Sequence, residues 1–130
     1  MTQEDKELLL KDLCGRLPYG IIASVRGSDE EFQHFHILGV KYGKVLVENN
    51  ILQVNDFEDA EVVKPYLRPM SSMTEEEREE YTSITHSQNW LIIGEADKYV
   101  DWLNAHHFDY RCLIEKGLAF EVTEENNPYK

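Results

Sequence analysis

Apolar side chains change their spacing near residue 56, and this change limits the folds that the chain can adopt. Before it, apolar and polar residues alternate in the segments 19–26, 33–40, 44–48 and 52–54, as in half-buried strands. Beyond it, apolar residues recur at helical spacing over 96–107. We therefore predict an α+β fold with an N-terminal helix and an antiparallel meander of three to four strands. A mainly helical C-terminal half with a short final strand follows.

Capping residues and helix breakers place the expected helices more closely. Thr2 is a plausible N-cap for the first helix, which Gly15 and Pro18 end. Thr74 and Glu77 have the spacing of a capping box, which predicts a helix through Tyr81.

The remaining segments have weaker signals. Residues 57–63 indicate a short helical turn, and 64–69 an ordered but irregular segment, because Pro65 and Pro69 stop a helix there. Asp109 can cap a short helix that ends at Gly117, and 118–122 form the expected last strand.

The length and continuity of the chain predict one domain. The 130 residues contain no internal repeat and no convincing linker, and a chain of this size can bury a substantial core. We expect a single α+β domain over 1–122 and a frayed tail over 123–130.

Acidic residues outnumber basic ones, 25 to 13, which gives a formal charge of −12. Such a charge repels phosphate backbones and anionic membranes, so we expect neither direct nucleic-acid binding nor membrane binding. The first residues do not have the pattern of a secretory signal, and no apolar stretch approaches membrane-spanning length, so we expect a cytoplasmic protein. Cys14 and Cys112 are interpreted as two buried thiols on the apolar sides of helices rather than as a disulfide.

Histidines are the best candidates for metal or catalytic chemistry. His34 and His36 would project from the same face of a strand, and His106 or His107 could add a further metal ligand. The alternative, which we favour, is that His34 and His36 lie on a polar or half-buried strand face. His106 and His107 are also placed to cap a helix C-terminus. We predict no catalytic residue and no cofactor, since neither a nucleophile motif nor a phosphate-binding loop is present.

The segment Pro65-Tyr66-Leu67-Arg68-Pro69 is the strongest candidate for protein binding. Its two prolines stiffen it and lower the entropic cost of presenting Tyr66, Leu67 and Arg68 to a partner. The alternative, which we favour, is a structural crossover with Tyr66 and Leu67 buried and Arg68 paired with a local acid.

Several strings resemble an uncharacterised family of short proteins from gut anaerobes and their phages and mobile elements. The strings are Leu17-Pro18-Tyr19-Gly20, residues 63–77 (VKPYLRPMSSMTEEE), residues 101–111 (DWLNAHHFDYR) and residues 113–119 (LIEKGLA). The resemblance implies no activity, cofactor or catalytic residue. Cys112 stands where this family would be expected to have a small residue such as glycine, which argues against a required nucleophile there.

These observations favour a non-enzymatic accessory or regulatory protein that binds another, unidentified protein, in a phage or mobile-element setting. A small metal-dependent or histidine-assisted enzyme is the first alternative. An acidic inhibitor that mimics phosphate and occupies a nucleic-acid-binding protein is the second, and it requires one continuous acidic face. The oligomeric state is not indicated by the sequence.

Overall fold

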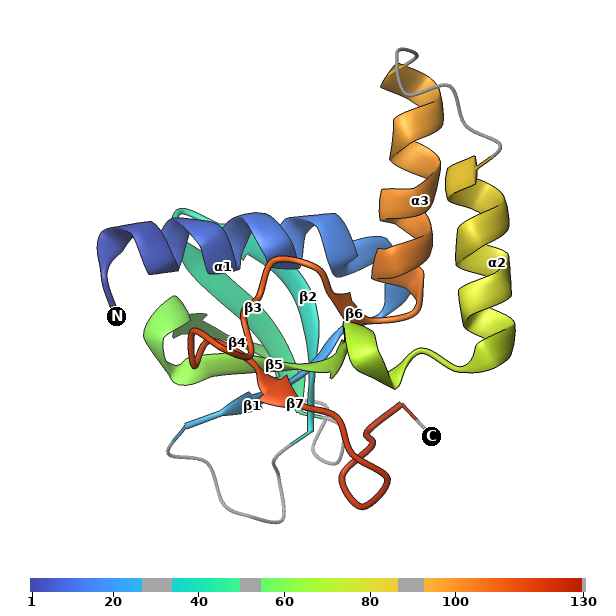
Figure 1. Cartoon of the computed structure of the whole chain (residues 1–130). Coiled ribbons are helices and arrows are strands. Elements are labelled where there is room, and N and C mark those ends of the chain that lie inside the picture. The colour runs from blue at the N-terminus through green and yellow to red at the C-terminus, as the bar shows by residue number, and fades with distance from the viewer. Residues whose placement is uncertain (27–33, 50–54, 87–92, 130) are drawn as a thin grey trace.

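The chain forms an α+β structure in which one helix covers a mixed sheet and two further helices extend beyond the sheet (Figure 1). The computed structural model describes residues 1–26, 34–49, 55–86 and 93–129. Its helices are α1 (Gln3–Arg16), α2 (Glu75–His86) and α3 (Ile93–Ala105). Its strands are β1 (Ile22–Val25), β2 (Phe35–Lys41), β3 (Lys44–Asn49), β4 (Asn55–Asp59), β5 (Val63–Pro69), β6 (Phe108–Asp109) and β7 (Phe120–Glu121). No described helix is long and apolar enough to cross a membrane.

The strands of the described residues join one sheet in the order β4-β3-β2-β1-β5-β6, with β7 also paired to β5. Strands β1 to β4 pair antiparallel in sequence, so the predicted meander is confirmed. β5 returns antiparallel to β1, and its other edge pairs in parallel with β7 at Tyr66 and Leu67 and with β6 at Arg68 and Pro69. The C-terminal half of the chain therefore extends the sheet beyond β1, through β5 and then β6 and β7.

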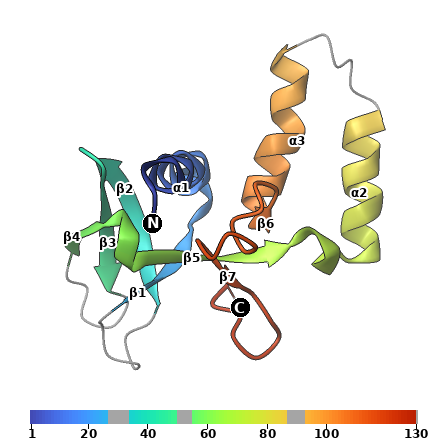
Figure 2. The ribbon, with the colours of Figure 1, turned by 60° about the vertical axis from the view of Figure 1, so that its left-hand side comes forward.

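The core lies between α1 and the sheet face that α1 crosses (Figure 2). Leu9 and Leu13 of α1 are fully buried there with apolar residues of β1, β2, β3 and β5. Thr2 begins α1 through a capping box with Asp5, which confirms the predicted N-cap. A second, smaller cluster of Trp102, Leu103 and Phe108 joins the α2–α3 hairpin to β6.

The fourth strand of the meander and the proline segment differ from expectation. The fourth strand lies at 55–59 and overlaps the helical turn expected at 57–63, while 52–54 lie outside the described residues. Within 57–63, Ala60–Val62 form a 3-10 turn. The segment 63–69 is the strand β5 and not an irregular crossover. Pro65 lies near the start of the strand, where it is opposite Ala23 of β1. It is tolerated because pairing on the other edge of β5 begins only at Tyr66, so Pro65 has a strand neighbour on one side.

The C-terminal part also differs from the sequence-based model. The capping box of Thr74 and Glu77 is confirmed, and α2 continues beyond Tyr81 to His86. Residues 110–117 form turns and not the predicted helix, although Asp109 does bind the backbone there. The carboxylate accepts hydrogen bonds from the amides of Leu113 and Ile114, both at 2.9 Å, and so stabilises a turn in place of a helix start. The final strand β7 is shorter than the predicted 118–122, because it spans only Phe120–Glu121.

Both cysteines are exposed, contrary to the prediction of two buried thiols. Cys14 lies on the outer side of α1, and Cys112 lies in the turn segment with φ of 60°. A left-handed backbone strongly favours glycine, which gives a physical reason to expect a glycine at this position. The backbone of Cys112 is therefore strained, and burial of its side chain does not compensate, because the residue is exposed.

Candidate functional site

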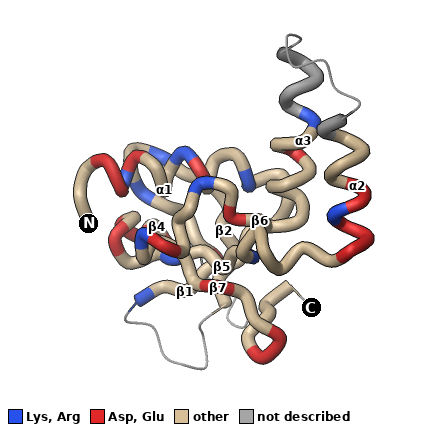
Figure 3. Tube along the Cα trace, viewed as in Figure 1, with Lys and Arg blue, Asp and Glu red and all other residues tan. Residues whose placement is uncertain are grey.

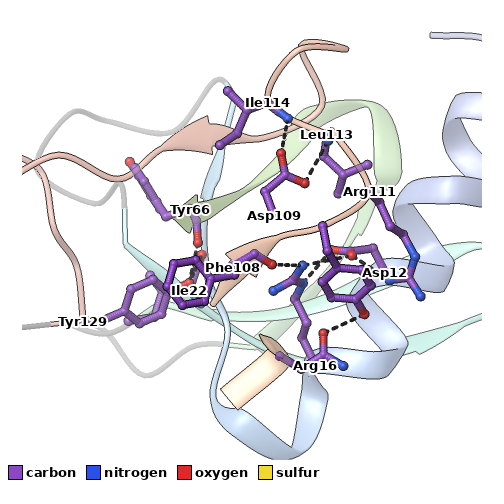
Figure 4. Close-up of polar contacts among 12 residues, drawn as sticks. Asp12, Arg16, Ile22, Tyr66, Phe108, Asp109, Arg111, Leu113, Ile114 and Tyr129 are labelled. Carbon is purple, nitrogen blue, oxygen red and sulfur yellow. Dashed lines mark hydrogen bonds and ion pairs between the residues drawn. The ribbon is translucent and has the colours of Figure 1, made fainter. Parts of the chain in front are cut away.

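A buried charge cluster joins α1 to the C-terminal half of the chain (Figure 4). Asp12 and Arg16 are one helical turn apart and both are fully buried. Arg16 Nε donates to Asp12 Oδ2 at 2.7 Å, and Arg16 Nη2 donates to the Phe108 carbonyl at 2.6 Å. Arg111 Nη1 adds a 2.7 Å bond to Asp12 Oδ1. The Asp12 carboxylate thus holds two cations from opposite ends of the chain.

Both guanidinium groups of this cluster lie near the ring of Tyr110. The guanidinium carbons of Arg16 and Arg111 lie 5.2 and 4.7 Å from its ring centroid, within the range of cation–π attraction. Its hydroxyl donates to Asn104 Oδ1 at 2.9 Å. The cluster therefore also fixes the end of α3 against α1, close to His106 and His107.

Tyr129 anchors the C-terminal segment, which the sequence had led us to expect as a frayed tail. Its hydroxyl accepts from the Ile22 amide at 3.2 Å and donates to the Tyr66 carbonyl at 2.7 Å (Figure 4). Its ring stacks on His107 with centroids 3.7 Å apart and an interplanar angle of 9°. Burial raises the pKa of the Tyr129 hydroxyl, so it remains a neutral donor.

Arg68 and Glu77 tie the end of β5 to the start of α2. The Nη1 and Nη2 atoms of Arg68 donate to the two oxygens of Glu77 at 2.8 and 2.6 Å, and the guanidinium lies 4.2 Å from the Phe108 ring centroid. The bonds from Arg68, together with those of the capping box, hold the pKa of Glu77 down to about 2. Arg68 of this pair and Tyr129 both line a hollow.

We call this hollow the C-terminal pocket; it has a volume of about 640 Å³. Three parts of the chain line it: the β5–α2 junction, the end of α3 and the segment 122–129. The lining residues on which its chemistry depends are Arg68, Thr74, His106, His107, Glu124 and Tyr129. The volume is within the range of small-ligand pockets, about 300–1,000 Å³.

The two histidines of the pocket have different roles. His106 Nδ1 lies 2.9 Å from the Trp102 carbonyl, and a carbonyl can only accept, so Nδ1 carries the hydrogen and a neutral ring has an acceptor at Nε2. His107 has a φ of 63° and sits in the turn after α3. Burial, and then the charges of Arg16 and Arg68, lower the pKa of His107 to about 4. His107 is therefore neutral at pH 7.

Hydroxyl groups around the pocket take part in local structural bonds. Ser72 Oγ donates to the Pro69 carbonyl at 2.8 Å, and Thr123 Oγ1 donates to Asn126 Oδ1 at 2.8 Å. Thr74 Oγ1 accepts the Glu77 amide in the capping box. These bonds hold the rim in place, and none of them joins a hydroxyl to a histidine.

The proposed metal ligands lie at different places in the fold. His34 is exposed just before β2 and contacts the edge of the Tyr66 ring, whereas His36 is half-buried within β2. His106 stacks on Trp102 at 4.1 Å, and His107 stacks on Tyr129. No group of three or more histidine, cysteine or acidic side chains among the described residues is arranged to hold a metal ion.

The proposed interaction segment is largely inside the protein. Pro65, Tyr66 and Leu67 are buried in β5, and Tyr66 is covered by the Phe120 ring at 5.7 Å. Arg68 and Pro69 are half-buried, and Arg68 pairs with Glu77. The burial of Tyr66 and Leu67 and the pairing of Arg68 agree with a structural role for the segment. Of its five residues, only Arg68 lines the C-terminal pocket.

Asp12, Arg16 and Tyr129 were missed as site-positioning residues. One signal for the first two was available, because an acid and a base stand four residues apart between Leu9, Leu13 and Leu17, on the apolar face of the first helix. Tyr129 follows a polar run, and its partners are 63 and 107 residues away in sequence, so no local pattern indicates its role.

Comparison with known proteins adds no further constraint: no family model matches the chain, and no curated protein or solved structure is significantly similar to it.

Proposed function

We propose that this chain is a non-enzymatic accessory protein that binds another protein, in the phage or mobile-element setting that the resemblance implies. The observation that supports this proposal is the C-terminal pocket, a preformed hollow whose rim is held by the Arg68–Glu77 pair and the Tyr129 anchor. A rim fixed in this way loses little entropy when it receives a side chain of a partner.

The engaged hydroxyls favour binding over nucleophilic catalysis. Ser72, Thr74 and Thr123 each use the hydroxyl in a structural hydrogen bond. The pKa of His107, at about 4, makes this imidazole a poor base at neutral pH. The pocket therefore supports recognition better than acyl transfer.

A site-specific photocrosslinker tests the proposal in the native host. Placed at Ser72, on the exposed rim of the pocket, it should capture a discrete protein partner. The matched control is Tyr42, whose side chain is 92% exposed in the β2–β3 turn. The next residue, Gly43, lies beside Lys6 of α1. Capture from Ser72 and not from Tyr42 supports the proposal. Equal capture from both positions, or none from either, contradicts it.

A histidine-assisted enzyme is the second candidate, because the His106 tautomer leaves Nε2 as an acceptor in the pocket. The test is turnover of a panel of model esters and phosphoesters by the wild-type protein and by His106→Gln. Turnover that the substitution abolishes would favour this candidate, and turnover that His106→Gln leaves unchanged would dismiss it.

In the view of Figure 3, acidic residues lie on several elements, among them α1, α2 and the C-terminal segment, and basic residues also lie on α1 and α2. This distribution does not support the one continuous acidic face that the phosphate-mimicking inhibitor requires. Asp12, Asp59 and Glu77 are each paired with a cation. These observations favour the first two candidates over the phosphate-mimicking inhibitor.

A further inference from the structure

Two hydrogen-bond acceptors in the C-terminal pocket are left open. His106 Nε2 has no partner among the described residues, and a neutral ring that donates through Nδ1 can only accept there. The carboxylate of Glu124, an exposed residue that also lines the pocket, likewise has no ion-pair or hydrogen-bond partner in the described part of the chain. A ligand that satisfies both groups must bring several donors.

Arg68 does not offset this preference, although it is the one arginine or lysine among the pocket-lining residues. Both of its terminal nitrogens are bonded to Glu77, and Nη2 also donates to the Ser72 carbonyl at 3.2 Å. Its charge is therefore neutralised at short range, and its donors are largely used. An anionic ligand would meet the Glu124 charge without a free cation to balance it.

The walls suit a flat cation on an apolar stem. The stacked rings of His107 and Tyr129 form one wall, and Ala105 and Val122 provide apolar surface. Guanidinium groups stack on aromatic rings through their weakly hydrated planar faces. The chain itself uses this contact where Arg68 lies over Phe108.

We infer that the C-terminal pocket binds an arginine side chain of the protein partner, with the guanidinium between Glu124 and His106. This inference rests on the proposed function, because it names the group that the partner contributes. The formal charge of −12 attracts a basic partner at long range, and the acceptors of the pocket then select its arginine at contact. The planar guanidinium of arginine has five N–H donors, so it can bond a carboxylate and an imidazole acceptor together better than the compact ammonium of lysine can.

Short peptides test the inference without knowledge of the partner. The blocked tripeptides Gly-Arg-Gly and Gly-citrulline-Gly have the same shape, but only the first carries a charge. Titration followed by amide NMR should shift the signals of residues 105–107 and 122–124 with the arginine peptide. The citrulline peptide should bind about tenfold more weakly, which is the ratio expected for the loss of one charge-assisted hydrogen bond.

Two neighbouring carboxylates provide the matched variants. Glu124→Gln should weaken binding of the arginine peptide about tenfold, since Glu124 lines the pocket. Glu125→Gln removes the same charge from the next exposed position, outside the residues that line the pocket, and should bind like the wild type. Equal affinities for arginine and citrulline, equal effects of the two variants, or tighter binding of a blocked Gly-Asp-Gly peptide would each overturn the inference.

The two proposals can fail separately. If the Ser72 crosslinker captures a partner but the pocket does not prefer the arginine peptide, the partner binds through other chemistry and only this inference fails. If the pocket selects arginine as described but the crosslinker captures no protein, the pocket is a site for a small cationic ligand and the proposed function fails.

Discussion

Asp12→Asn should be the most damaging single change of charge in the described structure. Asp12 is fully buried and accepts from Arg16 Nε, Arg16 Nη2 and Arg111 Nη1 at 2.7, 3.2 and 2.7 Å. The substitution preserves the size of the side chain but removes the charge that compensates Arg16. The Nη1 atom of Arg16 already has no partner among the described residues, so the substitution weakens the contacts of a guanidinium that is already incompletely hydrogen-bonded.

The expected cost follows from the burial of both partners. Breaking a buried ion pair by removing one charge costs about 3–5 kcal/mol, against a total stability of roughly 5–15 kcal/mol for a domain. In urea, with a slope of about 2 kcal/mol per M, the midpoint should fall by roughly 2 M. The matched control is Asp101→Asn, an exposed aspartate on α3, which should change the stability by less than about 0.5 kcal/mol.

A double variant separates the loss of the ion pair from the loss of packing. Asp12→Leu with Arg16→Met removes both charges and fills the space with apolar groups, so it should be less destabilised than Asp12→Asn alone. Arg111 can turn to solvent, because its side chain is already 22% exposed. A cost below about 1 kcal/mol for Asp12→Asn, or a double variant less stable than that single variant, would refute the reasoning.

Three further changes test the surroundings of the pocket. Because His107 has a pKa of about 4 in the folded state against an ordinary value of 6.5, the unfolded chain binds the proton first. Its contribution to stability is complete above pH 6.5 and is lost as the pH falls towards 4; we expect a loss on the order of 1–2 kcal/mol after allowing for partial exposure. Urea unfolding of the wild type and His107→Phe across this range measures the difference, and parallel pH profiles would argue against it. Glu77→Gln should cost about 1–2 kcal/mol at pH 7 by weakening the capping box and the Arg68 pair, whereas the exposed neighbour Glu76→Gln should have little effect. The difference between Glu77→Gln and the wild type should shrink as the pH falls from about 4.5 towards 2, where Glu77 itself becomes protonated. Cys112→Gly should raise the stability by about 1 kcal/mol, since glycine adopts a φ of 60° without strain, and Cys112→Ala should give no such gain in thermal unfolding.

Local signals predicted the parts of the fold that depend on local physics. The caps at Thr2 and Thr74 and the alternating strands of the meander all have their causes within a few residues. For this reason the α+β class, the first helix and the meander were predicted correctly.

Predictions were wrong where distant residues decide the conformation. Val63–Pro69 has the prolines of an irregular segment, yet it is a strand because β1 and the short strands β6 and β7 supply its neighbours. Residues 110–117 have a helix cap in Asp109, but Asp12 binds Arg111 and the buried side chain of Leu113 packs in the main core, so the segment forms turns. Tertiary contacts override local propensity in both places.

The candidate site shows the same division. The residue types of the pocket could be read from the sequence, since Arg68, His106 and His107 were all singled out as candidates there. Their assembly could not be read, because it depends on Tyr129 reaching the backbone of Ile22 and Tyr66 across the fold. By itself the sequence determined the acidic charge, the helix caps and the strand periodicity, which are properties of neighbouring residues. Only the tertiary structure decided which side chains line the pocket and which are buried, because these depend on contacts between residues far apart in the chain.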